Sequence, residues 1–147
     1  MEAKLLNGLA LAYLGDSVFE LEIRQYLLNS GITKVNNLNK KCVEFTKGLS
    51  QAKFINYLIS NNVLTEEEIN YYKKGRNSHI QSVRHNIDIK SYLDATGFES
   101  LIGYLYIENK ERLKYIIDLI IEKKEGNEIE WFKNWRIIWR RTKGFFR

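Results

Sequence analysis

Hydrophobic residues recur at intervals of three and four along nearly the whole chain, and no proline interrupts them. Because residues with this spacing share one face of a helix, the pattern predicts an all-α fold. A Thr-Glu-Glu-Glu capping box at residues 65–68 marks one helix start, and Asn-Ser-Gly at residues 29–31 marks a helix end. The expected helices cover about residues 4–28, 38–60, 65–72, 92–107 and 110–124, with an amphipathic segment from about residue 130.

The stretch from Arg76 to Lys90, RNSHIQSVRHNIDIK, does not share this helical pattern. It is polar, basic and poorly periodic. A stretch of this kind between two helices is typical of a solvent-exposed loop or a broken helical segment.

Two acidic residues occupy positions that otherwise look suited to burial. Asp16 lies in LAYLGDSVF and shares a helix face with Ala12 and Phe19. Glu99 lies in LDATGFESLIGYLYI and shares a face with Ala95. Small residues surround both acids and would let two helix backbones approach closely. We therefore expect Asp16 to be buried between packed helices and the two carboxylates to come together.

This pair of acids has two interpretations. In one, each acid caps a helix or forms an ion pair at the edge of the core, as single buried acids commonly do. In the other, carboxylates from facing helices hold a divalent cation, an arrangement that recurs in helical proteins. Oxygen ligands with open water positions suit Mg²⁺, with Mn²⁺ as the alternative, and such a cation acts on phosphate esters. Asp16 and Glu99 are thus candidate metal ligands and catalytic residues.

Composition narrows the class of protein without identifying a reaction. The 147 residues are enough for one domain, and a content of 44% hydrophobic and 28% charged residues favours a globular protein over a disordered or membrane-spanning one. One cysteine cannot form an intramolecular disulfide, and the two histidines lack the spacing of a zinc site. We therefore expect a cytoplasmic protein without thiol or zinc chemistry.

The segments LAYLGDSVFELEIRQYL and TGFESLIGYLYI resemble the two acidic helices of the ribonuclease III family, in the same order and at a similar separation. The resemblance covers about residues 4–124. Ala12 and Thr96 stand where the full-length enzymes carry acidic residues. The same two departures are found in the mini-ribonuclease III subclass, which consists of the nuclease domain alone and keeps acids like Asp16 and Glu99.

Two further acids lie near these positions. Asp94 is atypical of the subclass, and it points about 140° away from Glu99 around the helix, so we do not expect it to replace the missing ligand. Glu20 follows Asp16 by one turn and is either a partner of the metal ligands or a solvent-exposed residue.

The resemblance implies a fold and a function together. It implies a ribonuclease III-like helical bundle that forms a homodimer, and a Mg²⁺-dependent endoribonuclease that cleaves double-stranded RNA to leave 5′-phosphate and 3′-hydroxyl ends. It further implies maturation of the ends of the large-subunit (23S) ribosomal RNA precursor, with a ribosomal protein as a partner. The residues Ala12 and Thr96 leave a catalytically silent RNA-binding scaffold as the alternative, and an unrelated helical interaction protein is the third hypothesis.

The loop before the second acidic helix faces the substrate in this family. Duplex RNA is recognised mainly through phosphate and 2′-hydroxyl contacts, for which basic and amide side chains are suited. A solvated loop without a binding role is the alternative. The candidate RNA-binding residues in and beside the loop are Lys73, Lys74, Arg76, Asn77, His79, Arg84 and Lys90.

The net charge of +5 comes from the end of the chain. Six lysines and arginines follow residue 132 with no acid among them, which leaves residues 1–132 with a net charge of −1. We expect residues 1–126 to form the catalytic domain and residues 127–147 to form a basic, aromatic extension. For this extension we favour packing with some RNA contact over a membrane interface.

Overall fold

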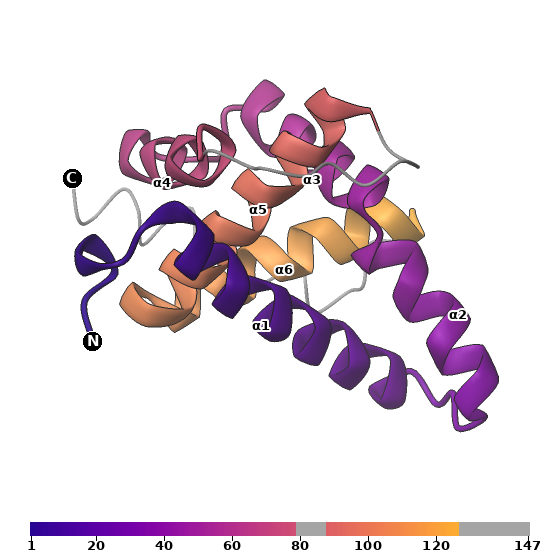
Figure 1. Cartoon of the computed structure of the whole chain (residues 1–147). Coiled ribbons are helices and arrows are strands. Elements are labelled where there is room, and N and C mark those ends of the chain that lie inside the picture. Colours follow the sequence, from indigo (N-terminus) through magenta and orange to yellow (C-terminus); the bar gives the residue numbers. More distant parts are fainter. Residues whose placement is uncertain (79–87, 127–147) are drawn as a thin grey trace. The chain divides into compact units, whose positions relative to one another are not determined.

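The computed structural model describes residues 1–78 and 88–126, and every regular element in these two ranges is a helix. The prediction of an all-α fold is therefore confirmed for these residues. A short 3-10 helix, η1 (Ala3–Leu5), precedes six α-helices (Figure 1). They are α1 (Gly8–Asn29), α2 (Val35–Thr46), α3 (Gly48–Ser60), α4 (Glu66–Arg76), α5 (Ile89–Glu108) and α6 (Lys110–Glu125).

Helix α5 is the centre of the first compact unit, which comprises residues 1–113. It contacts α1, α3 and α4, and Figure 1 shows it lying among them. Most of its middle is buried, from Asp94 through Gly103 with only Glu99 partly exposed. A helix surrounded in this way is apolar on nearly every side, which explains why its sequence carries little amphipathic pattern.

Aromatic side chains fill the space between α1, α3 and α5. The rings of Phe19 and Phe98 meet edge to face with centroids 5.0 Å apart, and Phe54 lies 6.3 Å from the first and 6.2 Å from the second. All three are almost fully buried. Aromatic pairs at these separations add to the stability that burial already provides, so this cluster fixes the three helices that carry the site.

The start of α4 is held by local and distant contacts. Thr65 and Glu68 form the predicted capping box, in which each side chain accepts a hydrogen bond from the other residue's backbone N–H. Glu68 is also paired with Arg112, whose Nε donates to Glu68 Oε2 at 2.8 Å, and both side chains are 5% exposed. A buried pair of this kind fixes position strongly, because removing one partner strands the other charge.

Several helix ends differ from the sequence prediction by three or four residues, with α2 beginning at Val35, α4 ending at Arg76 and α5 beginning at Ile89, and one expected helix is divided. The helix expected over residues 38–60 is two helices, because Lys47 adopts an extended backbone conformation (ψ 148°) between Thr46 and Gly48. The first helix begins at Gly8 instead of residue 4, with the side chain of Asn7 accepting a hydrogen bond from the N–H of Ala10. The segment expected from residue 130 lies outside the described residues.

The second compact unit begins at residue 114, and its described part continues α6 to Glu125. Within it, Lys114 Nζ donates to Asp118 Oδ1 at 2.9 Å, and burial raises the pKa of Asp118 more than this contact lowers it. The proposed boundary at residue 126 stays a prediction. No helix in the described ranges is both long and apolar enough to cross a membrane.

Candidate active site

Helices α1 and α5 cross closely at two glycines. A side chain at Gly15 would collide with the backbone carbonyl of Glu99, and one at Gly103 would collide with the backbone carbonyl of Leu11. Because only hydrogen fits at both positions, the two backbones are in direct contact. The prediction that small residues let these helices approach each other is confirmed. The crossing also brings Asp16, the neighbour of Gly15, close to α5.

The two candidate acids line one pocket of about 450 Å³. Asp16 reaches it from α1, and Glu99 reaches it from α5 together with Tyr92, Ala95 and Thr96. Asp16 is exposed and Glu99 is partly exposed, so neither side chain is closed off from the surface. The structure therefore brings together the two residues that sequence analysis selected.

The prediction that Asp16 is buried is wrong. The buried stripe of α1 runs through Ala12, Gly15 and Phe19, and Asp16 lies beside that stripe. One residue is a rotation of about 100° around a helix, so the glycine takes the packed position and the acid is turned to its edge. An edge position suits a ligand-binding carboxylate better than burial, because the charge stays hydrated until a ligand arrives.

The break between α2 and α3 forms the remaining wall of the pocket. Thr46, Lys47, Gly48, Leu49 and Gln51 all line it. Sequence analysis missed these residues because it placed them inside one continuous helix. Gly48 was the available signal, since glycine is the residue least suited to a helix interior apart from proline.

The positions that hold acids in the full-length enzymes offer no further carboxylate. Thr96 lines the pocket, but its hydroxyl donates to the backbone oxygen of Tyr92 at 3.0 Å. Ala12 is buried on α1. Asp94 is absent from the pocket lining, as its predicted orientation away from Glu99 requires.

The pocket offers the carboxylates of Asp16 and Glu99 as possible ligands for Mg²⁺. No group of three or more histidine, cysteine, aspartate or glutamate side chains in the described ranges is placed to hold a metal ion. Mg²⁺ is nevertheless commonly held by one or two carboxylates, with waters and substrate phosphates completing its shell. Asp16 and Glu99 in an open pocket fit that pattern.

Glu20 does not line the pocket. Arg24 Nη2 donates to its Oε1 at 3.1 Å, and the Glu20 side chain remains 45% exposed. The structure shows a half-exposed side chain in an ion pair within α1, and the role of Glu20 stays a prediction.

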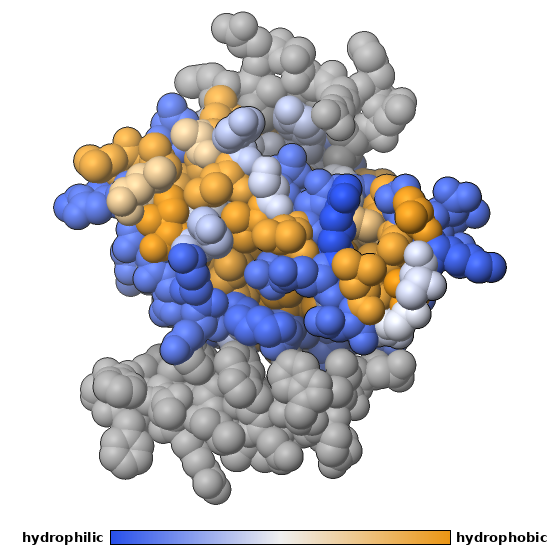
Figure 2. All heavy atoms as spheres, turned by 90° about the horizontal axis from the view of Figure 1, so that it is seen from below, coloured by the Kyte–Doolittle hydropathy of each residue, from blue (hydrophilic) through white to orange (hydrophobic). Residues whose placement is uncertain are grey.

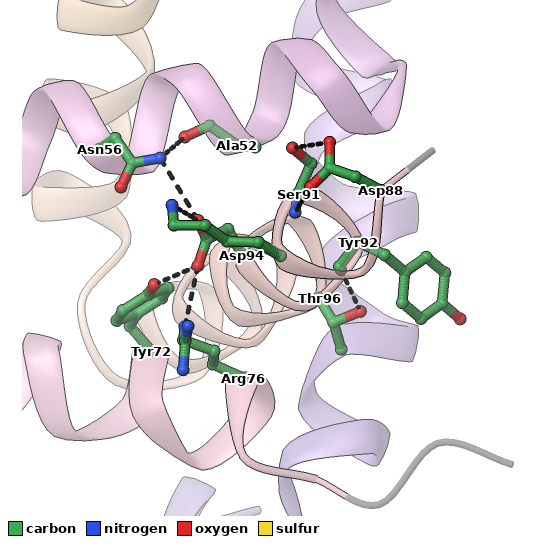
Figure 3. A network of polar contacts seen from close by, with 10 residues as sticks. Ala52, Asn56, Tyr72, Arg76, Asp88, Ser91, Tyr92, Asp94 and Thr96 are labelled. Atoms are coloured by element: carbon green, nitrogen blue, oxygen red, sulfur yellow. Dashed lines mark hydrogen bonds and ion pairs between the residues drawn. The ribbon is translucent and has the colours of Figure 1, made fainter. Parts of the chain in front are cut away.

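Asp94 is the centre of a buried polar network that sequence analysis missed (Figure 3). Its side chain is 2% exposed, and Oδ1 accepts hydrogen bonds from Tyr72 Oη at 2.7 Å and Arg76 Nε at 2.9 Å. Its Oδ2 accepts from Lys90 Nζ at 3.0 Å and from Asn56 Nδ2 at 3.4 Å. The network joins α3, α4 and α5. Arg76 precedes residues 79–87 and Lys90 follows them, and both donate to the same Asp94 carboxylate.

The charge of Asp94 is stabilised by these donors. Burial alone would raise its pKa, but the hydrogen bonds from Tyr72, Lys90, Arg76 and Asn56 outweigh burial and lower the pKa to about 2. Burial and the contact with Asp94 together raise the pKa of Tyr72. The network therefore contains a carboxylate that stays charged and a tyrosine that stays protonated at neutral pH.

The candidate RNA-binding residues fall into three groups. Lys73, Lys74 and Asn77 are exposed at the end of α4 and just after it. Arg76 and Lys90 are ion-paired with Asp94, although the Lys90 side chain remains 69% exposed. The other two candidates, His79 and Arg84, lie outside the described residues.

The chain is similar to proteins of one known family. The sequence pattern of the Ribonuclease III domain family matches residues 9–110. A Mini-ribonuclease 3 from Acholeplasma laidlawii is 51% identical over 114 residues, which are 78% of this chain and 90% of the relative. A Mini-ribonuclease 3 from Enterococcus faecalis is 44% identical over 127 residues, which are 85% of this chain and 96% of that relative.

A solved structure is similar to this chain in both fold and sequence. The crystal structure of a protein from Fusobacterium nucleatum has a TM-score of 0.73 and 32% sequence identity to this chain, and the match covers 81% of this chain and 94% of the other. The matched domain contains both pocket acids and the glycine crossing between α1 and α5. The chain therefore belongs to the ribonuclease III family and, within it, to the mini-ribonuclease III subclass.

Proposed function

We propose that this protein is a Mg²⁺-dependent endoribonuclease that cleaves double-stranded RNA, with Asp16 and Glu99 as its metal ligands. The observation that carries the proposal is that these two acids, from helices far apart in the sequence, line one open pocket. Membership of the ribonuclease III family supports the reaction class. The named activity of the relatives supports an RNA substrate.

The chain's own part in the reaction is to place two carboxylates in one pocket on helices whose positions are fixed. When bound, Mg²⁺ supplies a Lewis acid for a phosphoryl oxygen and lowers the pKa of a bound water. Asp16 and Glu99 would hold it, and glycine at position 15 lets the two helices that carry them approach closely. Hydrolysis of a phosphodiester at this pocket would leave 5′-phosphate and 3′-hydroxyl ends. Mn²⁺ is the alternative metal, because carboxylate and water ligands suit it as well.

The proposed duplex lies along the end of α4 and the segment that follows. Lys73, Lys74 and Asn77 offer exposed donors there. Arg76 and Lys90 contribute mainly by holding Asp94, although Lys90 also remains accessible. His79 and Arg84 stay proposals for RNA contact.

We also propose a homodimer, in which each protomer cuts one strand. Helix α1 exposes Leu9 and Tyr13 on the face that leads to Asp16, and α5 exposes Tyr106. Tyr13 is 83% exposed and lies one helical turn from Leu9, which is 45% exposed, and neighbouring exposed apolar side chains of this kind suit a protein–protein interface. Figure 2 shows hydrophobic surface open to solvent among hydrophilic residues on the face that it views.

The biological role that we propose is maturation of the ends of the 23S ribosomal RNA precursor in the cytoplasm, with a large-subunit ribosomal protein as a partner. The similarity to mini-ribonucleases III over most of the chain supports this role. Paired precursor ends would provide the duplex on which the proposed activity acts.

A cleavage assay on purified protein tests the proposal. An end-labelled RNA duplex derived from a precursor terminus is incubated with Mg²⁺ or with EDTA, beside the single strand and the DNA duplex of the same sequence. We expect cuts in the RNA duplex only, and only with Mg²⁺ or Mn²⁺. Binding of the RNA duplex without any cut under these conditions would instead favour the silent scaffold that Ala12 and Thr96 allow.

A further inference from the structure

The part of the pocket formed by the break between α2 and α3 carries positive charge and unused donors. Lys47 lines this wall and is exposed, and none of the ion pairs in the described ranges includes it. It lies in the same pocket as Asp16 and Glu99 yet is paired with neither. A cation that lines an acidic pocket without neutralising it is available to a ligand.

The first residues of α3 add backbone donors at the same place. The amides of Gly48 and Leu49 have no acceptor within the described part of the chain, and no side chain caps this helix start. Both residues line the pocket. Free N–H groups at the positive end of a 13-residue helix favour an anion.

Gln51 is the independent sign that a ligand belongs here. The residue is only 3% exposed, and it lines the pocket. Its side-chain amide has no hydrogen-bond partner among the described residues, and the amide atoms are not fully buried, so they reach the pocket. A side chain that is buried along most of its length and open at its amide offers a donor and an acceptor to whatever the pocket holds. The pocket is therefore where the Gln51 amide finds its partner.

We infer that Lys47, the Gly48 and Leu49 amides and Gln51 form a subsite for one backbone phosphate of the RNA strand that lies next to the scissile bond. The inference rests on the proposed function and adds a binding group to the same pocket. Its logic is electrostatic, since without a bound metal the two carboxylates of the pocket repel a phosphodiester, and positive charge on another part of the lining offsets this repulsion. The Lys47 ammonium and the α3 amides supply that positive charge, and the Gln51 NH₂ donates to a phosphate oxygen.

Binding without metal separates this subsite from the chemical step. Fluorescence anisotropy measures the affinity of an RNA duplex in EDTA over a series of salt concentrations, for the parent and for Lys47→Met, Gln51→Leu and the control Lys53→Met. Lys53 is an exposed lysine on the same helix that does not line the pocket. We expect Lys47→Met to weaken binding about tenfold and to lower the slope of log affinity against log salt by about one. Gln51→Leu should weaken binding severalfold at an unchanged slope, because the lost group is neutral.

The outcomes distinguish the subsite from the proposed function. Parent affinity and parent slope in Lys47→Met would overturn the subsite even if the enzyme cuts duplex RNA normally. An equal loss in Lys53→Met would also overturn it, because the effect would then be general surface charge. Parent affinity in Gln51→Leu would remove Gln51 from the subsite, and thermal unfolding checks that this variant is folded. A parent protein that cuts no RNA would contradict the proposed function and leave the binding comparison intact.

Discussion

Gly15 lies against the backbone carbonyl of Glu99, so the two helices that carry the pocket acids are in backbone contact at the pocket itself. The geometry of the proposed metal site is therefore set by this main-chain contact together with the aromatic cluster between α1, α3 and α5. Main-chain contact leaves little freedom for the distance between the two helices.

The first prediction concerns this contact. Gly15→Ala should destabilise the protein by about 2 kcal/mol or more, because its Cβ has no space against the Glu99 carbonyl. Folded Gly15→Ala protein should also bind Mg²⁺ more weakly than the parent, since α1 and α5 must move apart to make room for the added methyl group. Chemical denaturation and metal titration measure both effects. Ser17→Ala is the control on the exposed face of α1, and a Gly15→Ala protein with parent stability would contradict the crossing.

The second prediction concerns the Asp94 network. Asp94→Asn should lower the free energy of unfolding at pH 7 by about 2 to 3 kcal/mol, because Arg76 and Lys90 lose the charge that pairs them. Chemical denaturation measures this loss. Asp88→Asn is a control, since that exposed aspartate makes only local contacts at the start of α5.

The same network predicts a specific pH dependence. The pKa of Asp94 falls from its ordinary value of 3.8 to about 2 on folding, so the folded state favours the charged form. Its contribution to stability is then fully present above pH 3.8 and is lost as the pH falls toward about 2. The stability of Asp94→Asn should accordingly depend less on pH than that of the parent over this range. If the free energy of unfolding changed equally with pH in Asp94→Asn and in the parent, the lowered pKa of Asp94 would be contradicted.

Much of this site follows from the sequence by simple rules, and the rest follows from contacts between distant residues. The acids Asp16 and Glu99 stand out because each interrupts an apolar helix, and the small residues beside them indicate a close crossing. Helix periodicity predicts that Asp94 points away from Glu99. Periodicity alone does not say that Tyr72 and Arg76 of another helix meet that carboxylate, because this depends on how α4 packs against α5.

The break at Lys47 shows a second limit of sequence patterns. The apolar spacing continues from α2 into α3, so it predicts one helix where there are two. The Phe45 and Phe54 rings, 6.3 Å apart, show that both helices serve one core. Tertiary packing thus decides the backbone conformation at Lys47. The resulting break between α2 and α3 forms a wall of the pocket that the local sequence pattern does not predict.

A third prediction tests the homodimer. Placing acids at exposed apolar positions of α1, as in the double variant Leu9→Glu and Tyr13→Glu, should shift the protein to monomer without unfolding it, because buried like charges oppose association. Light scattering at micromolar concentration measures the change. Val43→Glu, at an exposed apolar position of α2, serves as the control. A parent protein that is monomeric at this concentration would contradict the dimer and the cutting of both strands by one complex.

A fourth prediction tests where the duplex is held. Lys73→Ala with Lys74→Ala should weaken duplex binding and lower the salt slope by about two, since each lost phosphate contact removes about one. The rate of the metal-bound chemical step at saturating RNA should change much less. If removal of residues 131–147 flattened the slope while the lysine variant kept it, the binding charge would lie in the C-terminal segment instead.

The measurement that tests the central claim most directly is single-turnover cleavage of an RNA duplex by Asp16→Asn and Glu99→Gln at saturating Mg²⁺. Both changes keep the shape of the side chain and remove the charge that a metal ligand needs. We predict that each variant folds, binds the duplex and cuts it at least about a thousandfold more slowly than the parent. Glu44→Gln, at an exposed position outside the pocket, should cut at the parent rate. Cleavage at the parent rate by either Asp16→Asn or Glu99→Gln would contradict the assignment of these two acids as the metal site.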